Sequence, residues 1–409
     1  MPPTSSAQPG PELRTPQSAG GIADAMRGRR VLVTGHTGFK GAWLCQWLLS
    51  IGATPIGLAL DPPSTPSLFD VLGLSRAMED HRVDVRDAAG VRRVVHGSGA
   101  SVIIHMAAQA LVRPSYADPV GTFETNVTGT ANLLEAIRTR PVADTRCAVV
   151  IVTSDKCYRP SPEPHAHREE EPLGGKDPYS ASKAAAEIVA ASFRDSFFAP
   201  ASLARHGVAL ATARAGNVIG GGDWALDRLV PDIATAMSKG TPVVLRNPAS
   251  DRPWQHVLDA LSGYLHLAAL LLGDDAARHA RAFNFGPDDA DPSGRLSVRD
   301  LTARMVRAWR RIDDDRIDVR DCYSERPDPN APPESPHLGL SIALAREQLR
   351  WRPTWTAAEA VTQTAAWYRA FLTEHADARA LTLAQIAAYT SHATERGRVW
   401  SAPTLDHAS

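Results

Sequence analysis

Cysteine is scarce in this sequence, with only four residues in a chain of 409. They lie far apart, and no two have the C-x-x-C spacing of zinc-binding and redox motifs. Four such isolated thiols do not form the framework that stabilises small secreted domains; they are Cys45, Cys147, Cys157 and Cys322. The pattern favours a reducing compartment. Since the N-terminus lacks the basic and apolar blocks of a secretory signal, we expect a cytoplasmic protein.

Charge of a single sign and long apolar runs are also lacking. The formal net charge is -1, so no global basic field is present to hold nucleic acid. No run of about 18 apolar residues occurs, which argues against a membrane-spanning helix. Residues 1–28 are rich in Pro, Ser, Gly and Ala and poor in large apolar side chains, and this composition predicts a disordered leader.

Apolar runs and helical patterns alternate from residue 30 to about residue 215. The apolar runs do not alternate with polar residues, so they predict buried strands at 30–35, 54–60, 101–108, 148–154 and 207–216. Helical patterns lie between them, at 41–52, 87–99, 124–140 and 180–198. This order predicts an α/β fold with a doubly wound parallel sheet of the Rossmann type.

The rhythm changes beyond about residue 220, where loops rich in Gly, Pro and Arg mix with shorter helices. We expect a nucleotide-binding domain over 29–220 and a smaller mixed substrate lobe over 221–372, with segments that could return to the large domain. Residues 321–336, rich in Pro and Asp, predict a long loop. Residues 373–409 predict a helical extension followed by a polar tail.

A glycine-rich stretch, "TGHTGFKG", joins the first predicted strand to the first predicted helix. Its glycines, Gly35, Gly38 and Gly41, permit a tight turn and close approach of the backbone to a pyrophosphate. The free N–H groups and the positive end of the helix would then hold the phosphates. The strand–turn–helix context is the one that a dinucleotide site requires, so we expect such a cofactor here.

Two carboxylates follow at positions suited to the adenosine half of that cofactor. Asp61 comes after the second strand, where it could accept hydrogen bonds from the ribose hydroxyls and would repel a 2′-phosphate, which favours NAD over NADP. The competing interpretation is a turn residue before Pro62. Asp84 could hold the adenine edge, although a helix cap explains it nearly as well.

Tyr179 and Lys183 lie four residues apart in "YSASK", on one face of a predicted helix. A phenol with its ordinary pKa of about 10 is a poor base at neutral pH. A neighbouring ammonium and a positively charged nicotinamide would stabilise the phenolate, so that Tyr179 could take a proton from a sugar hydroxyl. Lys183 could also hold the nicotinamide ribose. A surface pair is the competing interpretation, and the preceding nucleotide-binding pattern argues against it.

The sequence "VTSDKCY" places opposite charges, Asp155 and Lys156, directly after an apolar run. Alone, such a pair is typical of a surface turn. Side chains alternate along an extended strand, so the two can share a site only if the chain turns there. Cys157 follows, and with no histidine near it in the sequence we interpret it as a packed side chain.

Several long motifs together resemble the extended short-chain dehydrogenase/reductase family, over roughly residues 29–370. They are "TGHTGFKG", "HMAAQ", "YSASK" and "RAGNVIGGGDW". Within that family the sequence is most similar to the CDP-glucose 4,6-dehydratases, through "GHTGFKGAWL", "DPPSTPSLF", "VTSDKCY", "EPLGGKDPYSASK" and "RPWQHVLDALSGYL".

The resemblance implies an NAD-dependent conversion of CDP-glucose to its 4-keto-6-deoxy derivative. Oxidation at carbon 4 is followed by elimination of water across carbons 5 and 6, and return of the hydride to carbon 6 regenerates NAD. The cofactor is therefore expected to stay bound. A dehydratase or epimerase of another nucleotide sugar is an alternative, as is a non-catalytic NAD-binding scaffold. Asp155 and Lys156 argue against an epimerase, which needs no acid for water loss.

Roles at the end of the 148–154 strand also follow from the resemblance. Related dTDP-glucose dehydratases have Thr-Asp-Glu where this sequence has Ser154, Asp155 and Lys156. Ser154 is expected to bond the carbon 4 oxygen, and Asp155 to protonate the departing hydroxyl if an apolar pocket raises its pKa. Lys156 replaces the base. A lysine is a base only when neutral, so Lys156 either has a lowered pKa or stays protonated and stabilises the enolate.

The remaining site residues are implied by family position. Cofactor contacts are expected at Phe39, Val85, Ala107, Ala108 and Asn126, and substrate contacts at Gln109, Asn217, Arg228, Arg246, Arg252 and His256. Guanidinium groups suit the diphosphate, which favours Arg252 in particular. Arg228 and Arg246 could equally be solvated charges, and His256 could be a satisfied interior histidine.

Two further expectations concern partners. Helices around 119–138 and 180–197 occupy positions where the family commonly pairs two subunits, which implies a homodimer with a four-helix contact. His165 and His167, in "EPHAHREE", could suggest a metal. The implied reaction needs no metal, so a solvated loop is the favoured interpretation.

Overall fold

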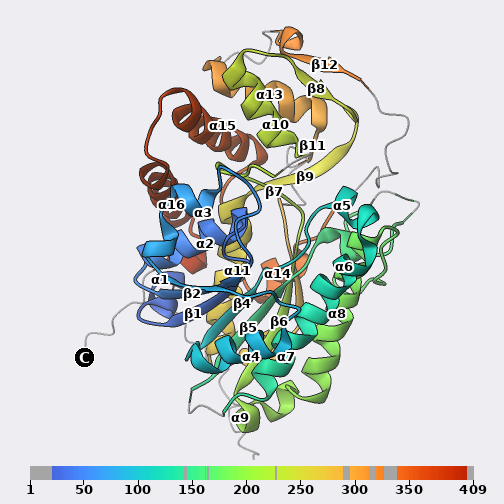
Figure 1. The fold of residues 1–409 in the computed structure, drawn as a ribbon, viewed down its shortest axis with the longest axis vertical. Helices are drawn as coiled ribbons and strands as arrows, with labels where there is room; N and C mark the ends of the chain where they lie inside the picture. The colour runs from blue at the N-terminus through green and yellow to red at the C-terminus, as the bar shows by residue number, and fades with distance from the viewer. Residues whose placement is uncertain are drawn as a thin grey trace, which may run out of the picture.

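A parallel sheet wrapped by helices lies beneath a smaller lobe in the computed structural model (Figure 1). The structure describes residues 21–141, 145–161, 163, 165–225, 228–288, 295–312, 318–326 and 339–402. In that part of the chain, no helix is both long enough and apolar enough to cross a membrane.

Seven parallel strands form the central sheet, in the order β10-β6-β5-β4-β1-β2-β3. They are β1 (Arg30–Thr34), β2 (Thr54–Ala59), β3 (Glu79–Arg82), β4 (Val102–His105), β5 (Cys147–Val152), β6 (Val208–Ala215) and β10 (Ala282–Phe285). All five predicted strands are confirmed. The sequence missed both edge strands, β3 and β10. β3 reads Glu-Asp-His-Arg, since an edge strand need not be apolar, and β10 has only four residues.

Both faces of the sheet are covered, as a doubly wound fold requires. Along β1, Val31 and Val33 enter one core while Leu32 enters the other. The first core contains α2 (Phe39–Ser50) and α11 (Val257–Leu272). The second contains α4 (Ala88–Gly97), α7 (Gly129–Arg138) and α8 (Pro178–Ser196). This burial on both faces explains why β1, β4 and β5 read as continuous apolar runs.

The small lobe is built from segments beyond residue 216. Its elements are β7 (Asn217–Ile219), α10 (Leu229–Lys239), β8 (Val243–Leu245), β9 (Asp251–His256), β11 (Arg295–Ser297), α13 (Val298–Arg310), β12 (Tyr323–Glu325) and α15 (Ala357–Thr373). One small sheet has the order β11-β9-β7, and β8 pairs with β12 in parallel. The expectation of a long loop over 321–336 is therefore wrong for its first residues, and 327–336 lie outside the described residues. α11 and β10 return to the large domain, as the sequence allowed.

The remaining helices are short. They are α3 (Leu68–Val71), α5 (Val112–Ala117), α6 (Pro119–Phe123), α9 (Leu203–His206), α12 (Ala276–His279) and α14 (Ala343–Gln348). The helix predicted over 124–140 begins with a π-helical turn, Glu124–Thr128, before α7. Such wide turns are rare and often lie at functional sites.

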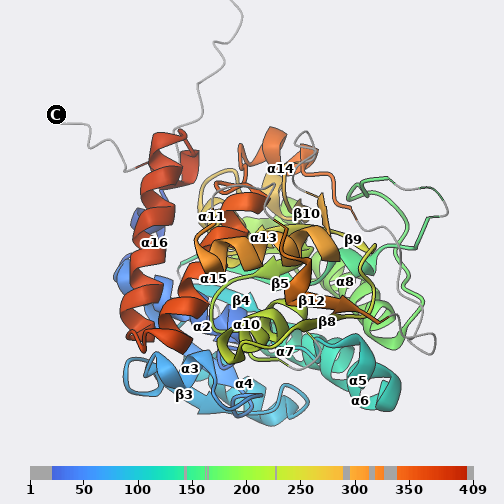
Figure 2. The same cartoon turned by 90° about the horizontal axis from the view of Figure 1, so that it is seen from above.

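Both ends of the described chain pack against the large domain. α1 (Ile22–Met26) buries Ile22 and Met26, so the predicted leader over 1–28 was too long, and residues 1–20 lie outside the described residues. α16 (Ala378–Glu395) stands along one side of the molecule against α2 (Figure 2). Past it, the ring of Trp400 stacks on Tyr389, with ring centres 5.4 Å apart. The helical extension is confirmed.

Candidate active site

The carboxyl ends of the central strands meet beneath the small lobe (Figure 1). Gly35 follows β1, Ala107 and Ala108 come shortly after β4, and Ser154 comes shortly after β5. In open α/β sheets, ligands bind in the crevice outside these strand ends. The predicted cofactor and catalytic residues are therefore brought to the same edge of the sheet.

The glycine loop is shaped to receive a phosphate-bearing group. Gly35 has φ of 74°, and a Cβ there would lie 2.7 Å from the backbone nitrogen of Ala107, so only glycine fits. A Cβ on Gly41 would collide with the Gly35 carbonyl. Gly38 begins the 12-residue helix α2 without a side-chain cap, and its first turn, which starts at Phe39, contains no acidic residue. The positive helix end thus fits the pyrophosphate of a dinucleotide.

The two carboxylates expected at the adenosine end lie beside arginines. The Asp61 side chain is 92% exposed, and its carboxylate lies 3.5 Å from Arg82. Asp84 accepts hydrogen bonds from the guanidinium of Arg86, which lower the pKa of that carboxyl. Val85, which lies between Asp84 and Arg86 in the sequence, is buried against Gly129. The ribose and adenine contacts of these residues stay predictions.

Asn126 and Gln109 clamp the loop that follows β4. The Asn126 carbonyl oxygen accepts from the Gln109 backbone at 2.9 Å, and its amide donates to the Gln109 carbonyl and to Ser182. The Gln109 amide donates in turn to the Leu111 carbonyl and to Thr122. Both side chains therefore position the loop, and their direct contacts with cofactor and substrate stay predictions.

The chain turns sharply after β5, where the sequence placed its opposite charges. Residues Asp155–Cys157 form a 3₁₀ turn, and Ser154 caps it by accepting a hydrogen bond from the Lys156 backbone at 3.2 Å. The Ser154 hydroxyl donates to Asp155 at 3.0 Å. The chain therefore turns at this point, which is the condition for Asp155 and Lys156 to share a site.

Asp155 is a buried carboxyl with one oxygen that lacks a partner in the described part of the chain. Its side chain is buried, and its Oδ2 has no hydrogen-bond partner among the described residues. Burial raises the pKa of Asp155, while the charge of Lys156 and the hydrogen bond from Ser154 act in the opposite direction. A carboxyl with a raised pKa keeps its proton toward neutral pH, as an acid for water loss must.

Tyr179 and Lys183 stand on α8 beside this turn. Burial raises the pKa of Tyr179 to about 12, although its hydrogen bond with Ser154 and the Arg228 charge oppose the rise. In the protein alone, desolvation of the phenolate outweighs nearby charge, so the expected stabilisation of the phenolate with a nicotinamide bound stays a prediction. Burial also lowers the pKa of Lys183 to about 8, and its ammonium lies 3.4 Å from the Val152 carbonyl.

A buried ion pair beneath the site was not foreseen. Glu187 pairs with Arg214 at 2.8 Å, with side chains 3% and 5% exposed. Glu187 also accepts a hydrogen bond from Thr153, the residue before Ser154. Because Tyr179, Lys183 and Glu187 follow one another at four-residue intervals, this pair fixes their shared helix face to the strand end.

Lys40 is the second residue of the site that sequence reasoning missed. Its ammonium donates to the Tyr264 hydroxyl at 3.2 Å. Burial, with the charges of Lys183 and Arg228, lowers the pKa of Lys40 to about 7. The signal in the sequence was a lysine in the first turn of a helix that is otherwise apolar and buried, "FKGAWLCQWLL".

The 3₁₀ turn Asp155–Cys157, which contains the predicted acid and base, is named the catalytic turn. Of the predicted substrate residues, two arginines lie near it. Arg252, in β9, is buried, and its charge lowers the pKa of Asp155. Arg228 precedes α10 and lies 3.6 Å from Asp223. Asn217 begins β7, whereas Arg246 is exposed after β8.

Two other side chains fit interior roles. His256 is buried between Trp43 and Trp355, and its ring caps α11 by accepting from the Leu258 backbone at 3.2 Å. Burial lowers the pKa of His256 to about 3, so the ring stays neutral. The interior alternative therefore suits His256 better than a substrate contact. Burial raises the pKa of the Cys157 thiol, in keeping with a packed side chain.

Comparison with known sequences gives relatives over most of the chain. The model of the family described as GDP-mannose 4,6 dehydratase matches residues 32–364. A CDP-glucose 4,6-dehydratase of Salmonella typhimurium is 45% identical over 346 residues, which cover 85% of this chain and 92% of the relative. A dTDP-glucose 4,6-dehydratase of Streptomyces griseus is 28% identical and covers 83% of this chain and 93% of its own.

Solved structures share the fold. A dTDP-glucose 4,6-dehydratase of Streptomyces venezuelae, with NAD and TYD bound, has a TM-score of 0.65 at 25% identity and covers 83% of this chain and 97% of its own. A UDP-glucose 4-epimerase of Thermus thermophilus, in complex with NAD, has a TM-score of 0.66 at 27% identity, with coverage of 83% and 99%. Since dehydratase and epimerase have the same fold, the fold alone does not decide between the two activities.

We predict that Asp155→Asn stabilises the protein at neutral and higher pH by about 1 kcal/mol, because a neutral amide costs less to bury than a carboxylate. The raised pKa means that the folded protein binds this proton more tightly than the unfolded chain, whose reference value is 3.8. The stabilisation should therefore be full above the folded pKa and shrink as the pH falls. Urea unfolding across this pH range measures it.

The matched control is Asp195→Asn, at a carboxylate that is 75% exposed, which should change the free energy of unfolding little at any pH. A stability of Asp155→Asn equal to or below that of the parent protein throughout the pH range would contradict the assignment of a costly buried charge.

Proposed function

The chain belongs to the GDP-mannose 4,6-dehydratase family of extended short-chain dehydrogenases/reductases, and from this membership we propose that it is an NAD-dependent lyase that dehydrates CDP-glucose. The product is the 4-keto-6-deoxy sugar nucleotide. One observation supports the dehydratase chemistry above the others: the buried Asp155 carboxyl, with a raised pKa, in the turn that Ser154 caps. The choice of the cytidine nucleotide is supported by the 45% identity to a CDP-glucose 4,6-dehydratase.

NAD is the proposed cofactor. Support comes from the glycine loop, with its uncapped helix end, and from the exposed carboxylate of Asp61 beside the end of β2. When bound, NAD supplies the transient oxidation of carbon 4 and the later reduction of carbon 6. Gly35, Gly38 and the first turn of α2 would hold it, and Lys183 would hold a ribose.

Tyr179 and Ser154 would handle the proton of the carbon 4 hydroxyl. Their side chains share a hydrogen bond at the same strand end, where Ser154 is buried and Tyr179 is partly buried. In the protein alone the phenol keeps its proton, so proton acceptance by Tyr179 requires added positive charge, which an oxidised nicotinamide would bring. Ser154 would steady the carbon 4 oxygen while the proton moves.

Asp155 would protonate the departing carbon 6 hydroxyl. Hydroxide is a poor leaving group, so elimination needs a donor that still holds its proton near neutral pH. The raised pKa of Asp155 is a shift in the direction of this need, and its Oδ2, which has no hydrogen-bond partner among the described residues, is the oxygen that could face the sugar. The buried cation of Arg252 limits how far the pKa of Asp155 rises.

The base that removes the carbon 5 proton is one of two amines. Lys156 has the position, next to the acid in the same turn, and we assign the base role to it. Lys40 has the lowered pKa, about 7, that an amine base needs. Lys156 as an electrostatic stabiliser of the enolate, with Lys40 as the base, is the competing mechanism.

We also propose that the protein is a homodimer and lies in the cytoplasm. Among the described residues, five of the seven exposed large apolar side chains lie on α5, α6 and α8 or directly after α8, and these helices lie side by side (Figure 1); the five are Tyr116, Val120, Phe123, Ile188 and Phe197. Such a patch supports a homodimer through these helices. The four unpaired cysteines support a reducing, cytoplasmic location.

We predict that the purified protein removes water from CDP-glucose, and not from dTDP-glucose, UDP-glucose or GDP-mannose supplied separately. Mass spectrometry of each sugar nucleotide measures the loss, and Asp155→Asn is the control that should abolish it. Loss from another substrate would contradict the cytidine assignment while keeping the dehydratase chemistry. No loss from any substrate, in protein shown to contain NAD, would contradict the enzyme.

We predict that Lys156→Met lowers kcat for CDP-glucose by about 10²- to 10⁴-fold, the usual contribution of a general base. Lys40→Met should reduce it less, and Lys239→Met, at an exposed lysine, should leave it unchanged. The pH profile separates the two mechanisms. A rate that rises with pH through about 7 in the parent, and loses this rise in Lys40→Met, would identify Lys40 as the base.

We predict that the protein migrates at twice its chain mass of 43.9 kDa in size exclusion with light scattering. Ile188→Asp, on α8, should shift it to the monomer mass, because a charge would be desolvated in the helix contact. Val244→Asp is the matched control, since Val244 is 51% exposed but lies in β8 of the small lobe. A monomeric parent, or a dimer that survives Ile188→Asp, would contradict this contact.

A further inference from the structure

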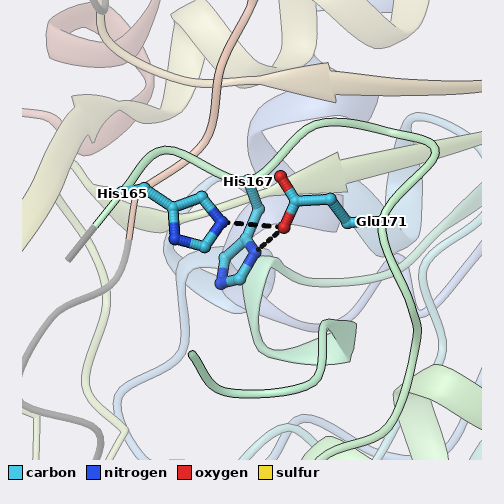
Figure 3. A group of neighbouring side chains, drawn as sticks. All are labelled: His165, His167 and Glu171. Atoms are coloured by element: carbon cyan, nitrogen blue, oxygen red, sulfur yellow. Dashed lines mark hydrogen bonds and ion pairs between the residues drawn. The ribbon is translucent and has the colours of Figure 1, made fainter. Parts of the chain in front are cut away.

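Three potential metal ligands come together in the loop between the catalytic turn and α8. His165, His167 and Glu171 each offer one ligand atom, and these atoms lie within 4.8 Å of one another. Figure 3 shows both imidazole rings directed at the same carboxylate oxygen. His165 Nε2 lies 2.8 Å from Glu171 Oε2, and His167 Nδ1 lies 2.6 Å from it. No residue assigned to the proposed dehydration takes part.

The hydrogen bonds around His165 require a cation between its ring and Glu171. Its Nδ1 lies 3.2 Å from the Glu163 carbonyl, which can only accept, so Nδ1 carries a proton. In the neutral ring Nε2 would then present a lone pair to a carboxylate oxygen, which is repulsive. A second proton or a metal ion removes the repulsion.

The ligands are held in the way that metal ligands usually are. The Nδ1 hydrogen bond of His165 to a backbone carbonyl orients its ring and leaves Nε2 for a metal. The other carboxylate oxygen of Glu171 accepts from the Arg168 backbone at 2.8 Å. His167 is fixed by its backbone, which bonds to Gly339 and Ser341 at 2.9 Å each, and its ring stacks on Tyr158.

From this geometry we propose that His165, His167 and Glu171 bind a divalent first-row transition metal, with Zn²⁺ as the best match to two imidazoles and one carboxylate. Zinc bonds of about 2.0–2.2 Å in a tetrahedral arrangement separate neighbouring ligand atoms by roughly 3.3 Å. The two nitrogen–oxygen distances must therefore lengthen by roughly half an ångström. The side chain of His165 is 40% exposed and Glu171 27%, so both can move, and solvent can supply a fourth ligand.

The site would act by securing the loop that links the catalytic turn to α8. His167 stacks on Tyr158 with ring centres 4.8 Å apart and planes at 4°. The Tyr158 hydroxyl accepts from Arg214 at 2.8 Å and donates to Asn284 at 2.7 Å. A metal on His167 would thus stabilise a loop that is already anchored to the large domain. Its role is structural, and its removal should lower stability more than it changes the chemical step.

The test uses the full chain with any affinity tag removed, stripped of metal by a chelator and titrated with Zn²⁺ against a chromogenic chelator. We expect one Zn²⁺ per chain and a rise in melting temperature on binding. His165→Gln and Glu171→Gln should each weaken Zn²⁺ binding at least about tenfold. Co²⁺ should give the visible absorption of a four-coordinate site in the parent and not in His165→Gln or Glu171→Gln.

His375→Asn is the matched control, because His375 is exposed and lies in the loop that follows α15. It should bind Zn²⁺ as the parent does. Circular dichroism of the stripped variants checks that His165→Gln and Glu171→Gln are folded. Zn²⁺ binding that is absent in the parent, or equal in the parent and both ligand variants, would overturn the proposal and leave a proton shared between His165 and Glu171.

Discussion

The buried ion pair between Glu187 and Arg214 is the interaction on which the rest of the site depends. It joins α8 to β6, and the hydrogen bond from Thr153 to Glu187 adds β5. A buried pair of this kind contributes little net stability, because desolvation offsets the attraction, but it penalises any arrangement that separates the two charges. Its effect is to set the register between the helix face that holds Tyr179 and the strand end that holds the catalytic turn.

Positive charge exceeds negative charge around the reacting position. The imbalance follows in part from the Glu187–Arg214 pair, in which the Glu187 carboxylate is already neutralised. Burial lowers the pKa of Lys183 to about 8 and that of Lys40 to about 7, although the charge of Glu187 opposes the fall at Lys183 and the charge of Asp155 opposes it at Lys40. Asp155 is the buried acid that faces them, and burial raises its pKa. A site of this composition favours an anionic ligand and keeps its own ionisable groups near their neutral forms, which suits acid–base exchange near neutral pH.

The sequence was sufficient for the scaffold and for the residues at strand ends. Apolar runs without alternation predicted β1, β2, β4, β5 and β6, because strands buried on both faces can accept only apolar side chains. It failed for β3, whose polar residues are tolerated at an edge. It also failed for Lys40 and Glu187, since their importance comes from contacts with Tyr264 and Arg214 that lie far away in sequence. The rise that burial causes in the Tyr179 pKa could not be predicted either, because burial cannot be judged from one helix alone.

The turn after β5 shows how local and distant constraints combine. Ser154 can cap a 3₁₀ turn by itself, so the local sequence allows the turn without specifying where it points. Its direction is set from outside: Tyr158, four residues on, is held by Arg214 through its hydroxyl and by His167 through its ring. The same guanidinium therefore fixes the segment after the turn and, through Glu187, the helix that faces it. A substitution that loosens Tyr158 should displace both Asp155 and α8, because the buried guanidinium of Arg214 holds the segments that contain them.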